Sequence, residues 1–353
     1  MDKTQSTTAY LLAQCALYPA LQPQDLLKAL HQSVFGCGHF IQDESAARSF
    51  LQEELAALSL QDGPVFELLD GDFCRFHLRA LEESGLSPET LLRLFILSAE
   101  APCGSAEELE EKLAVLLSLA QDGRLPFSYA ESAAAVDSWR QQGFPACHHS
   151  PAFRAAYAPA YRVIRKDFLR WLPLLAAIDQ KSPALVAIEG GSASGKTTLA
   201  ALLARIYPCN VFHMDDYFLQ PKQRTAERLD EPGGNVDRER FYEEILLPLT
   251  QHRPVAFRRY DCHTQTLQPP TVVPSRALNI VEGAYSMHPL LADAYDLSVF
   301  LRVSPEVQRR RIGVRNAPET AERFFSTWIP LEHRYFDALD VPARCDMILE
   351  VDA

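Results

Sequence analysis

Residues 185–205 read LVAIEGGSASGKTTLAALLAR and combine three features of a phosphate-binding loop. The apolar run Leu185–Glu189 is typical of a buried strand, and the next eight residues match the pattern GxxxxGK[ST]. Thr198–Arg205 then has the composition of a helix. Because a strand before the loop and a helix after it are the context that this pattern requires, a chance glycine- and serine-rich turn is a poor alternative.

The residues that we expect to bind ATP lie in and just after this loop. Glycines let the backbone curl so that successive N–H groups point at the phosphates, and the following helix adds its positive N-terminal end. Lys196 is expected to reach the β- and γ-phosphates, and the Thr197 hydroxyl is expected to bind Mg²⁺. The predicted ATP-binding residues are Gly190, Gly191, Ser192, Ala193, Ser194, Gly195, Lys196, Thr197 and Thr198.

The pattern of apolar residues changes near residue 180, and a chain of 353 residues is long enough for about two domains. Before that point helical patterns follow one another, for example at 45–58, 90–98 and 107–120, and β-branched runs are nearly absent. This predicts an all-α domain over residues 1–180. Afterwards short apolar runs alternate with helical ones, which predicts an α/β domain with a parallel sheet over residues 181–353. The expected strands lie at 185–189, 211–214, 278–281, 297–303 and 347–351.

Charge and cysteine content restrict the partners that we expect. The formal net charge is −12 and the isoelectric point is about 5.3, which argues against a nucleic-acid or anionic-membrane partner. No apolar run is long enough to span a membrane, and the first residues lack the pattern of a secretory signal. The eight cysteines form no CxxC pair. We therefore expect a cytoplasmic protein with free thiols and a small-molecule partner.

Two later strands are predicted to end in acids that phosphoryl transfer needs. In an open parallel sheet, ligands bind at the carboxyl ends of the strands. Asp215, at the end of VFHMDD, is the candidate base that accepts the proton of an acceptor hydroxyl, and Asp216 is the second choice. Glu282 is the candidate ligand of Mg²⁺ through a water molecule. An aspartate pair that caps a turn, and an ordinary acid at a strand end, are the alternatives.

An arginine-rich helix is expected to begin near Pro305 and to contain RRRIGVR, residues 309–315. Arg311 and Arg315 would share one face of this helix. The planar guanidinium group suits the diffuse charge of a transferring phosphoryl group, so we predict that these two arginines clamp it. A solvated charged face is the alternative.

Six motifs, in order, make the region from about residue 184 to 353 resemble the uridine kinase / phosphoribulokinase family of P-loop kinases. They are GGSASGKTT, MDDYF, LDEPGGNVD, RRYDC, VEGAY and RRRIGVRN. The resemblance implies a five-stranded parallel sheet flanked by helices, ATP and Mg²⁺ as cofactors, and a lid near the arginine helix. It also implies Asp215 as the general base, Asp230 at the ribose hydroxyls and Tyr260 at the nucleoside base.

The sequence departs from the uridine kinase pattern after Tyr260. The family has a histidine five residues later and an arginine two residues beyond that, whereas this chain has Gln265 and Leu267 there and a histidine at 263. Tyr285 and His288 are additional candidates, which would line the acceptor pocket or pack under the lid. The predicted acceptor-binding residues are Asp216, Asp230, Tyr260, Tyr285 and His288.

These observations predict an ATP-dependent kinase for a hydroxyl group of a small polar metabolite, with a nucleoside such as uridine as the first choice. Pantothenate, a sugar phosphate or glycerate as the acceptor is the first alternative. An ATP-binding regulatory protein without turnover is the second. Residues 1–180 resemble no family, and their role in oligomerisation, in acceptor recognition or in a second activity stays open.

Two segments of the N-terminal half contain candidate functional residues. VFGCGHF, residues 34–40, would present Cys37 or His39 to a ligand or form a glycine-containing turn between helices. PACHHSP, residues 145–151, groups Cys147, His148 and His149, but adjacent histidines do not suit one metal ion. The aromatic residues after it, up to Arg162, read as one helical packing stripe.

Overall fold

The computed structural model describes residues 3–37, 43–58, 63–100, 104–181 and 184–352. The chain forms two compact units, Met1–Ala176 and Ala177–Ala353, and their junction lies within helix α9 (Leu172–Lys181). The predicted boundary at residue 180 falls in the same helix. Each unit contains its own cluster of buried apolar side chains, and each is described separately below.

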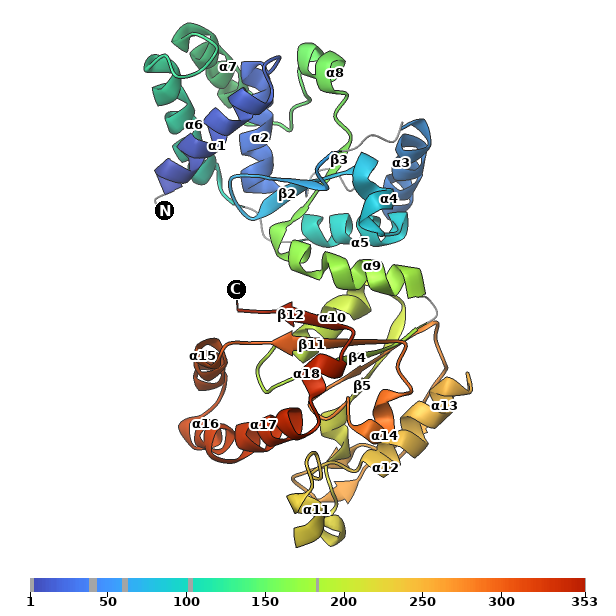
Figure 1. Ribbon diagram of the computed structural model, residues 1–353. Helices are drawn as coiled ribbons and strands as arrows, with labels where there is room; N and C mark the ends of the chain where they lie inside the picture. The colour runs from blue at the N-terminus through green and yellow to red at the C-terminus, as the bar shows by residue number, and fades with distance from the viewer. Residues whose placement is uncertain (1–2, 38–42, 59–62, 101–103, 182–183, 353) are drawn as a thin grey trace. The chain divides into compact units, whose positions relative to one another are not determined.

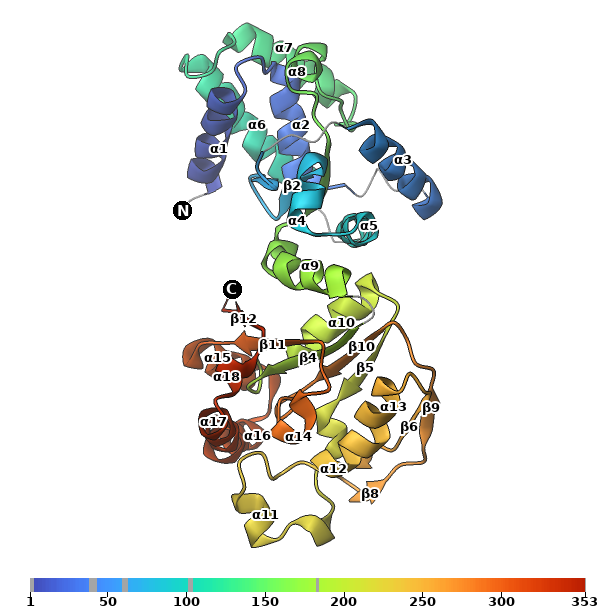
Figure 2. The same ribbon diagram turned by 45° about the vertical axis from the view of Figure 1, so that its right-hand side comes forward.

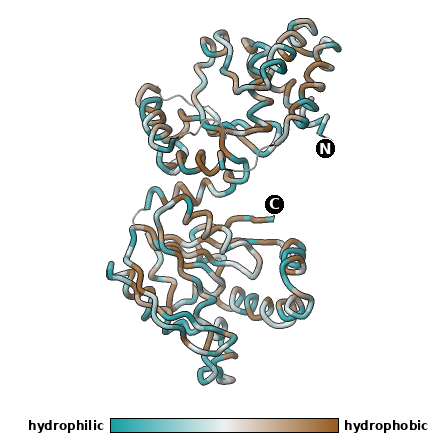
Figure 3. The backbone as a smooth tube through the Cα atoms, turned by 180° about the vertical axis from the view of Figure 1, so that it is seen from behind, coloured by the Kyte–Doolittle hydropathy of each residue, from teal (hydrophilic) through white to brown (hydrophobic). Residues whose placement is uncertain are grey.

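The second unit is built on a parallel sheet of five strands in the order β12-β11-β4-β10-β5 (Figure 1). Every residue of β4 and β10 is buried, as expected for central strands that helices cover on both faces. The strands of this sheet are among the hydrophobic, brown parts of the unit in Figure 3. The sheet confirms the predicted five-stranded architecture, and each strand lies within two residues of a predicted run. The strands are β4 (Ala184–Gly190), β5 (Cys209–His213), β10 (Leu278–Glu282), β11 (Leu297–Arg302) and β12 (Met347–Glu350).

Helix α10 (Lys196–Ile206) follows the phosphate loop and packs against β4, β5 and β10. Figure 2 shows α11 and β8 beyond α12, away from the sheet. Two short antiparallel pairs, β6 with β9 and β7 with β8, lie between β5 and β10 in the chain. The other elements are α11 (Ala226–Asp230), α12 (Arg238–Phe241), α13 (Leu247–Thr250), β6 (Val255–Phe257), β7 (Tyr260–Asp261), β8 (Thr266–Leu267), β9 (Thr271–Val273), α14 (Pro289–Ala292), α15 (Pro305–Arg315), α16 (Pro318–Arg323), α17 (Ile329–Ala338) and α18 (Val341–Arg344).

The register of the sheet brings the predicted site together. Glu282, the last residue of β10, is aligned with Ile188 of β4 and with His213 of β5. The carboxyl ends of these three parallel strands therefore meet at one edge. The phosphate loop follows β4 at that edge, and Asp215 follows β5, so the ligand-binding edge of the sheet is where the sequence motifs lie.

The first unit is mainly helical, as predicted, but it also contains a three-stranded antiparallel sheet that corrects the all-α prediction for this region. The order is β1-β2-β3. The middle strand β2 is buried on both faces and contains no β-branched residue, so neither alternation nor composition signals it. The elements are α1 (Lys3–Leu17), α2 (Pro23–Phe35), α3 (Glu44–Ala57), β1 (Phe66–Leu68), β2 (Phe73–His77), α4 (Leu81–Ser84), α5 (Pro88–Ala99), α6 (Ala106–Gln121), α7 (Tyr129–Gln141), α8 (Pro151–Tyr157) and β3 (Tyr161–Arg165).

The same strand also changes the interpretation of the predicted packing stripe. Helix α8 ends at Tyr157, and Tyr161 and Arg162 belong to β3, so the stripe is split between a helix and a strand. In α6, by contrast, Leu109, Leu113 and Leu116 are buried as the helical periodicity predicts. No helix of the described ranges combines the length and the apolar composition needed to cross a membrane.

Candidate active site

The phosphate loop turns between β4 and α10 with two residues in left-handed conformations. Gly195 has a φ of 99° and Ala193 a φ of 59°. A Cβ atom placed on Gly195 would meet no other atom within 4 Å, so the space beside this turn is open. Gly190 is constrained for another reason, because a Cβ there would lie 2.7 Å from the carbonyl oxygen of Leu301 in β11. The loop is thus curled and open, as a phosphate cradle requires.

Lys196 lies at the start of α10, and its Nζ donates to the carbonyl oxygen of Gly191, 2.9 Å away. Desolvation by the surrounding protein raises the pKa values of the neighbouring Asp215 and Glu332 carboxyls, and the positive charge of Lys196 partly opposes both shifts. The loop therefore holds a cation among acidic side chains. An incoming polyphosphate would find this ammonium group and the helix N-terminus at the same place.

Thr197 and Glu282 meet at the ends of α10 and β10. The Thr197 hydroxyl donates to Glu282 Oε1 at 3.1 Å, and the Glu282 side chain is buried. Both are oxygen donors, the type that Mg²⁺ prefers. Within the described part of the chain no group of three or more His, Cys, Asp or Glu side chains is arranged to hold a metal ion. The donor set therefore fits a Mg²⁺ ion that a nucleotide's phosphates and water would mainly coordinate, with these two residues beside it.

His213 is a residue of this site that the sequence analysis missed. Its Nδ1 lies 2.5 Å from Glu282 Oε1, and this hydrogen bond raises the pKa of the imidazole, against the opposing effect of burial. The contact fixes the orientation of the Glu282 carboxylate in the manner of an outer-shell partner. The only local signal was its position two residues before Asp215 in VFHMD.

Asp215 lies just beyond β5, and its side chain is exposed. Within the described ranges its carboxylate makes no hydrogen bond and no ion pair, unlike Glu282 and Glu332 close by. Surrounding protein raises the pKa of this carboxyl through desolvation, an effect that Glu282 adds to and Lys196 opposes. A partly desolvated and unengaged carboxylate near the lysine of a phosphate loop suits a general base.

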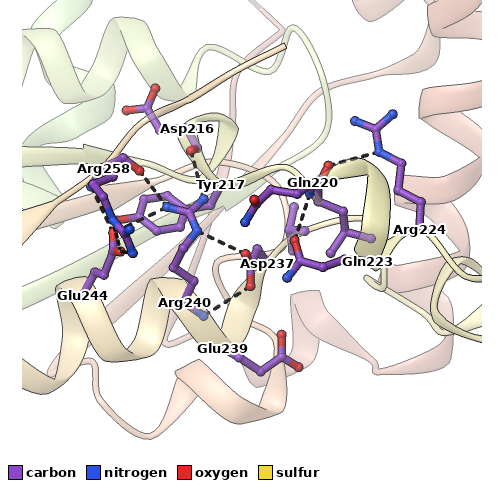
Figure 4. Close-up of polar contacts among 12 residues, drawn as sticks. Asp216, Tyr217, Gln220, Gln223, Arg224, Asp237, Glu239, Arg240, Glu244 and Arg258 are labelled. Carbon is purple, nitrogen blue, oxygen red and sulfur yellow. Dashed lines mark hydrogen bonds and ion pairs between the residues drawn. The ribbon is translucent and has the colours of Figure 1, made fainter. Parts of the chain in front are cut away.

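The next residue, Asp216, is engaged differently. Its carboxylate forms an ion pair with Arg259 at 3.3 Å, and its backbone carbonyl accepts a hydrogen bond from Arg240 (Figure 4). Of the two adjacent acids, Asp215 is therefore the one whose carboxylate is available. This arrangement favours the first choice of the sequence analysis over the second.

Arg240 is buried and organises the segment that follows Asp215 (Figure 4). Its guanidinium group lies 4.0 Å from the centre of the Tyr217 ring and donates to Asp237 Oδ2 at 3.1 Å and to the Arg258 carbonyl at 2.6 Å. Cation–π contact and charge-assisted hydrogen bonds thus converge on one side chain. Arg240 therefore ties the backbone of Asp216 to α12 and to the chain before β7.

We expect Arg240→Met to destabilise the second unit by about 3–5 kcal/mol, because it leaves Asp237 buried without its counterion. Arg258→Met is the matched control. Arg258 is 46% exposed and pairs with Glu244, so its loss should change stability by only about 0–1 kcal/mol. Urea titrations of the parent and both variants measure the unfolding free energy. Hydrogen exchange of the β4 and β10 amides during the titration reports on the second unit. Equal destabilisation by the two variants would contradict the assigned role.

The outer side of the phosphate loop is held by residues from two later helices. Glu332 of α17 accepts from the Ser192 backbone N–H at 2.8 Å and from its hydroxyl at 2.6 Å. Gln308 of α15 donates to the Ser192 carbonyl at 2.8 Å. Because Glu332 is 140 residues away in sequence from Ser192, no local pattern could have predicted these hydrogen bonds.

The same helix α15 carries the two arginines that are predicted to clamp the phosphoryl group. Arg311 donates to the backbone carbonyls of Ala193, at 3.2 Å, and Val351, at 2.6 Å. Arg315 is exposed and lies 5.9 Å from the centre of the Phe324 ring. Arg311 is therefore engaged with backbone carbonyl groups, one of them in the phosphate loop, and the phosphate clamp stays a prediction.

Two of the predicted acceptor-binding residues lie in very different surroundings. Tyr260 is 4% exposed, and within the described ranges its buried hydroxyl has no hydrogen-bond partner. A buried hydroxyl without a partner is costly, so this group would gain from a hydrogen-bond partner that the described residues do not supply. The side chain of Asp230 is instead 84% exposed and forms an ion pair with Arg334 of α17 at 3.0 Å.

The rings of Tyr285 and His288 lie close to Gly233, the first glycine of LDEPGGNVD. A Cβ atom on Gly233, which has a φ of 74°, would lie within 3.4 Å of the rings of Tyr285, His288 and Tyr335. Tyr285 itself has a φ of 77°, which is rare for a bulky residue and is found at functional sites. Burial lowers the pKa of His288 to about 4. In this structure the two residues pack on the chain itself.

Glu189 is a fully buried carboxyl group directly before the phosphate loop. It accepts from the backbone N–H of Gly190 at 2.8 Å, from that of Met287 at 3.0 Å and from the Tyr335 hydroxyl at 3.1 Å. Burial raises its pKa to about 7, although these hydrogen bonds oppose the shift. Glu189 thus connects the start of the loop to the chain after β10 and to α17.

The elevated pKa of Glu189 predicts a pH-dependent stability. Between its ordinary pKa of 4.5 and the folded value of about 7, the folded state binds the proton more often than the unfolded state. The unfolding free energy of the second unit should therefore fall as the pH rises through this window. We expect the unfolding free energy to be a few kcal/mol lower at about pH 8 than at about pH 5. Urea titration at the two pH values measures it, with hydrogen exchange of the β4 amides as the signal from this unit.

In Glu189→Gln the part of this dependence that Glu189 causes should disappear, so the fall in unfolding free energy should be clearly smaller than in the parent. The control variant, Glu306→Gln, removes an exposed carboxyl group from the first turn of α15 and should keep the dependence of the parent. An identical pH dependence in the parent and in Glu189→Gln would exclude Glu189 as its source.

The N-terminal candidates lie apart from this site in the chain. The Cys37 side chain is buried, and its thiol lies 3.6 Å from the Phe95 carbonyl oxygen, while His39 lies outside the described residues. His149 is buried between Asp25 and Tyr161, 2.9 Å and 2.7 Å away, so its imidazole belongs to a hydrogen-bonded chain.

Comparisons with known proteins concern about half of the chain. No protein-family model matches it. A possible uridine kinase from Bacillus stearothermophilus is 23% identical, with a TM-score of 0.40, over 52% of this chain and 96% of that protein. A proposed fructose transport system kinase from Silicibacter sp. TM1040 is 21% identical, with a TM-score of 0.37, over 46% and 88%. Shikimate kinase from Bacteroides thetaiotaomicron is 15% identical, with a TM-score of 0.27, over 48% and 86%.

The fold of the second unit rests on its own geometry. A central parallel strand leads into the curled loop, the loop leads into α10, and acids follow the neighbouring strands at the same edge. The second unit thus has the P-loop kinase fold that the six motifs predict.

Proposed function

We propose that the second unit transfers the γ-phosphoryl group of ATP to a hydroxyl group of a small molecule. The observation that carries this proposal is the free, exposed carboxylate of Asp215 at the same sheet edge as the phosphate loop. A regulatory nucleotide-binding protein needs the loop but not an unengaged carboxylate beside it. In phosphoryl transfer to an alcohol, such a carboxylate accepts the hydroxyl proton.

The residues of the loop would bind and orient the nucleotide. Backbone N–H groups of residues 193–197 and the N-terminus of α10 would bind the phosphates, with Lys196 at the β- and γ-phosphates. Thr197 and Glu282 would hold Mg²⁺, with His213 orienting Glu282. When bound, ATP·Mg²⁺ supplies the transferable phosphoryl group and neutralises part of its charge. The protein's own contribution is position, electrostatics and the proton acceptor.

A nucleoside such as uridine is our first choice of acceptor. The resemblance of the six motifs supports it, and so does the buried Tyr260 with its free hydroxyl, which suits a heterocyclic base with hydrogen-bonding groups. In this proposal Asp230, Tyr285 and His288 would contribute to the acceptor site. Asp230 and its partner Arg334 would then have to separate or rearrange when the acceptor binds.

A non-nucleoside acceptor is the second candidate, and the segment after Tyr260 favours it. β7 and β8 form a tight hairpin here, with Gln265 at a φ of 56°. Gln265 and Leu267 stand where uridine kinases have a histidine and an arginine. Pantothenate, a sugar phosphate or glycerate would not need those contacts to a base.

An acceptor screen separates these possibilities. ADP release from MgATP by the full chain is first measured without an acceptor. It is then measured with each of five acceptors in turn: uridine, cytidine, pantothenate, glycerate and a ketose phosphate. The true acceptor should raise ADP release at least about tenfold above the background hydrolysis, because it replaces water as the nucleophile at an oriented site. Stimulation by uridine or cytidine supports the nucleoside proposal, and stimulation by another acceptor alone supports the second. If ATP binds and no alcohol stimulates its consumption, the regulatory alternative is favoured instead.

A further inference from the structure

The first unit contains a cavity of about 710 Å³ that the kinase chemistry does not use. Residues of α2, α3, α5, α8 and β3 line it, and these elements can be followed in Figure 1. Its volume lies in the range of roughly 300–1,000 Å³ that small-molecule sites occupy. The charged and aromatic side chains of the lining indicate the class of ligand.

Arg162 of β3 is a buried basic residue of this lining. Its side chain is 9% exposed, and its Nη1 donates to Glu54 at 2.8 Å. Its Nη2 is buried and has no hydrogen-bond partner among the residues that the structure describes. Buried donors are nearly always satisfied, so this unpaired donor, on a side chain that lines the cavity, points to an acceptor other than the described residues. An anionic oxygen is the acceptor that a guanidinium group binds most strongly.

The other charged groups of the lining favour the same sign of ligand. Lys28 of α2 is also buried, and its Nζ donates to the Cys147 carbonyl oxygen at 2.8 Å. Arg154 of α8 forms no ion pair within the described ranges. The two acids are already engaged, since Asp43 caps α3 through the N–H groups of Ser45 and Ala46, and Glu54 pairs with Arg162. The lining thus contains three lysine or arginine side chains, Lys28, Arg154 and Arg162, and two acidic ones.

Apolar and aromatic groups make up much of the remaining wall. The guanidinium carbon of Arg162 lies 5.7 Å from the ring centres of both Phe50 and Phe95. Phe50 of α3 is 64% exposed, an unusual state for a large aromatic side chain that lines a cavity. An aromatic part of a ligand that packs on Phe50 would cover its exposed face.

The back of the cavity is rigid. Tyr161 and His149 both line it, and their hydrogen bond at 2.7 Å continues to the buried Asp25. The Asp25 carboxylate also accepts from the backbone N–H and the hydroxyl of Ser150. A network that is satisfied in this way holds its members in one arrangement. The cavity is thus preorganised, which lowers the cost of binding.

We infer that this cavity binds a small organic anion, with its carboxylate or phosphate at Arg162 and its aromatic or apolar part against Phe50. This site is independent of the phosphate loop, and it goes beyond the proposed kinase function. It assigns to the first unit the recognition of an acidic metabolite.

Isothermal titration of the full chain with benzoate tests the inference, and benzyl alcohol serves as a neutral probe of similar size. Benzoate should bind saturably at roughly millimolar concentrations, and more tightly than benzyl alcohol by about tenfold or more. The titration is repeated on Lys196→Ala, where the benzoate affinity should be unchanged. No saturable binding of benzoate, equal binding of the two probes, or loss of binding in Lys196→Ala would each overturn the proposal.

Two pairs of variants locate the site. Arg162→Gln should weaken benzoate binding by about tenfold or more, whereas Arg165→Gln, three residues further along β3 and outside this cavity, should not. Phe50→Ala should weaken it by about tenfold, and Phe66→Ala on β1 should have no effect. Because Phe50 is exposed, Phe50→Ala should leave the fold intact. The Phe50 pair therefore still tests the proposal if Arg162→Gln does not fold. Equal effects within either pair would overturn the assignment.

Discussion

Asp215→Asn is expected to lower the turnover number by about 10²–10⁴-fold while ATP affinity stays within a few-fold of the parent. Asparagine has the same shape but cannot accept a proton from an acceptor hydroxyl. Asp215 also makes no hydrogen bond or ion pair within the described ranges, so the substitution should not disturb the fold. The measurement is ADP release with the acceptor found in the screen, together with titration of an ATP analogue.

Two further variants make this prediction specific. Asp216→Asn should have a much smaller effect on turnover, since the Asp216 carboxylate is paired with Arg259. Asp293→Asn, which changes an exposed aspartate at the end of α14, serves as the control and should be neutral. Turnover of Asp215→Asn at the level of the parent would exclude Asp215 as the base.

The raised pKa of Asp215 adds a pH signature to the same experiment. Only the ionised carboxylate can accept the hydroxyl proton, so turnover should fall as the pH drops below that pKa. Because desolvation shifts the pKa upward, the fall should begin at a higher pH than for an ordinary aspartate. Residual turnover in Asp215→Asn should lack this acidic limb.

Lys196→Ala is expected to reduce both ATP affinity and turnover. Removing a charge-assisted contact to the phosphates should weaken ATP binding by about ten- to a hundredfold. The loss of positive charge where negative charge develops should lower turnover by about 10²–10³-fold. Within the described residues the Lys196 ammonium group makes one hydrogen bond, to the Gly191 carbonyl, so the fold should be little affected.

Arg302→Ala is the control for the lysine variant. It removes an exposed cation of the same unit that pairs with Glu350, and both ATP affinity and turnover should stay unchanged. Analogue titration and ADP release give both quantities. If Lys196→Ala bound ATP as tightly as the parent, the assignment of the phosphate loop would be wrong.

The comparison of the two acids after β5 illustrates what the tertiary structure added to a correct sequence prediction. The motif MDDYF places two carboxylates at a strand end, and nothing in the sequence distinguishes them by their contacts. The structure pairs Asp216 with Arg259, which lies beyond β6 in the chain, and leaves Asp215 unengaged. The role of Asp215 stays a prediction, but the geometry now gives a reason to prefer it.

The arginine helix illustrates the opposite case. Helical spacing correctly predicts α15 and puts positions 311 and 315 on related faces. It does not reveal that the carbonyl groups of Ala193 and Val351 lie opposite Arg311, since both belong to distant parts of the chain. A strong local pattern was therefore sufficient to predict the helix but not the contacts of its side chains, and the clamp stays a prediction.

The first unit shows why local patterns can also miss an element. β2 and β3 are short and buried on most of their length, so polar and apolar residues do not alternate in them. β2 includes the fully buried Arg75, whose guanidinium group is satisfied by Gln32 and Glu67 from α2 and β1. A sequence pattern reads such an arginine as exposed, because its partners are known only after folding.

The sequence by itself determined the phosphate loop, the five strands and the order in which the catalytic candidates follow them. These features depend on backbone conformation and on hydrophobic periodicity, which residues encode locally. Only the tertiary structure decided that the Asp215 carboxylate is unpaired within the described residues, how Glu332 holds Ser192, and that Arg162 lines a cavity. Those properties depend on side-chain contacts between segments far apart in the chain, and such contacts exist only once the packing has brought the segments together.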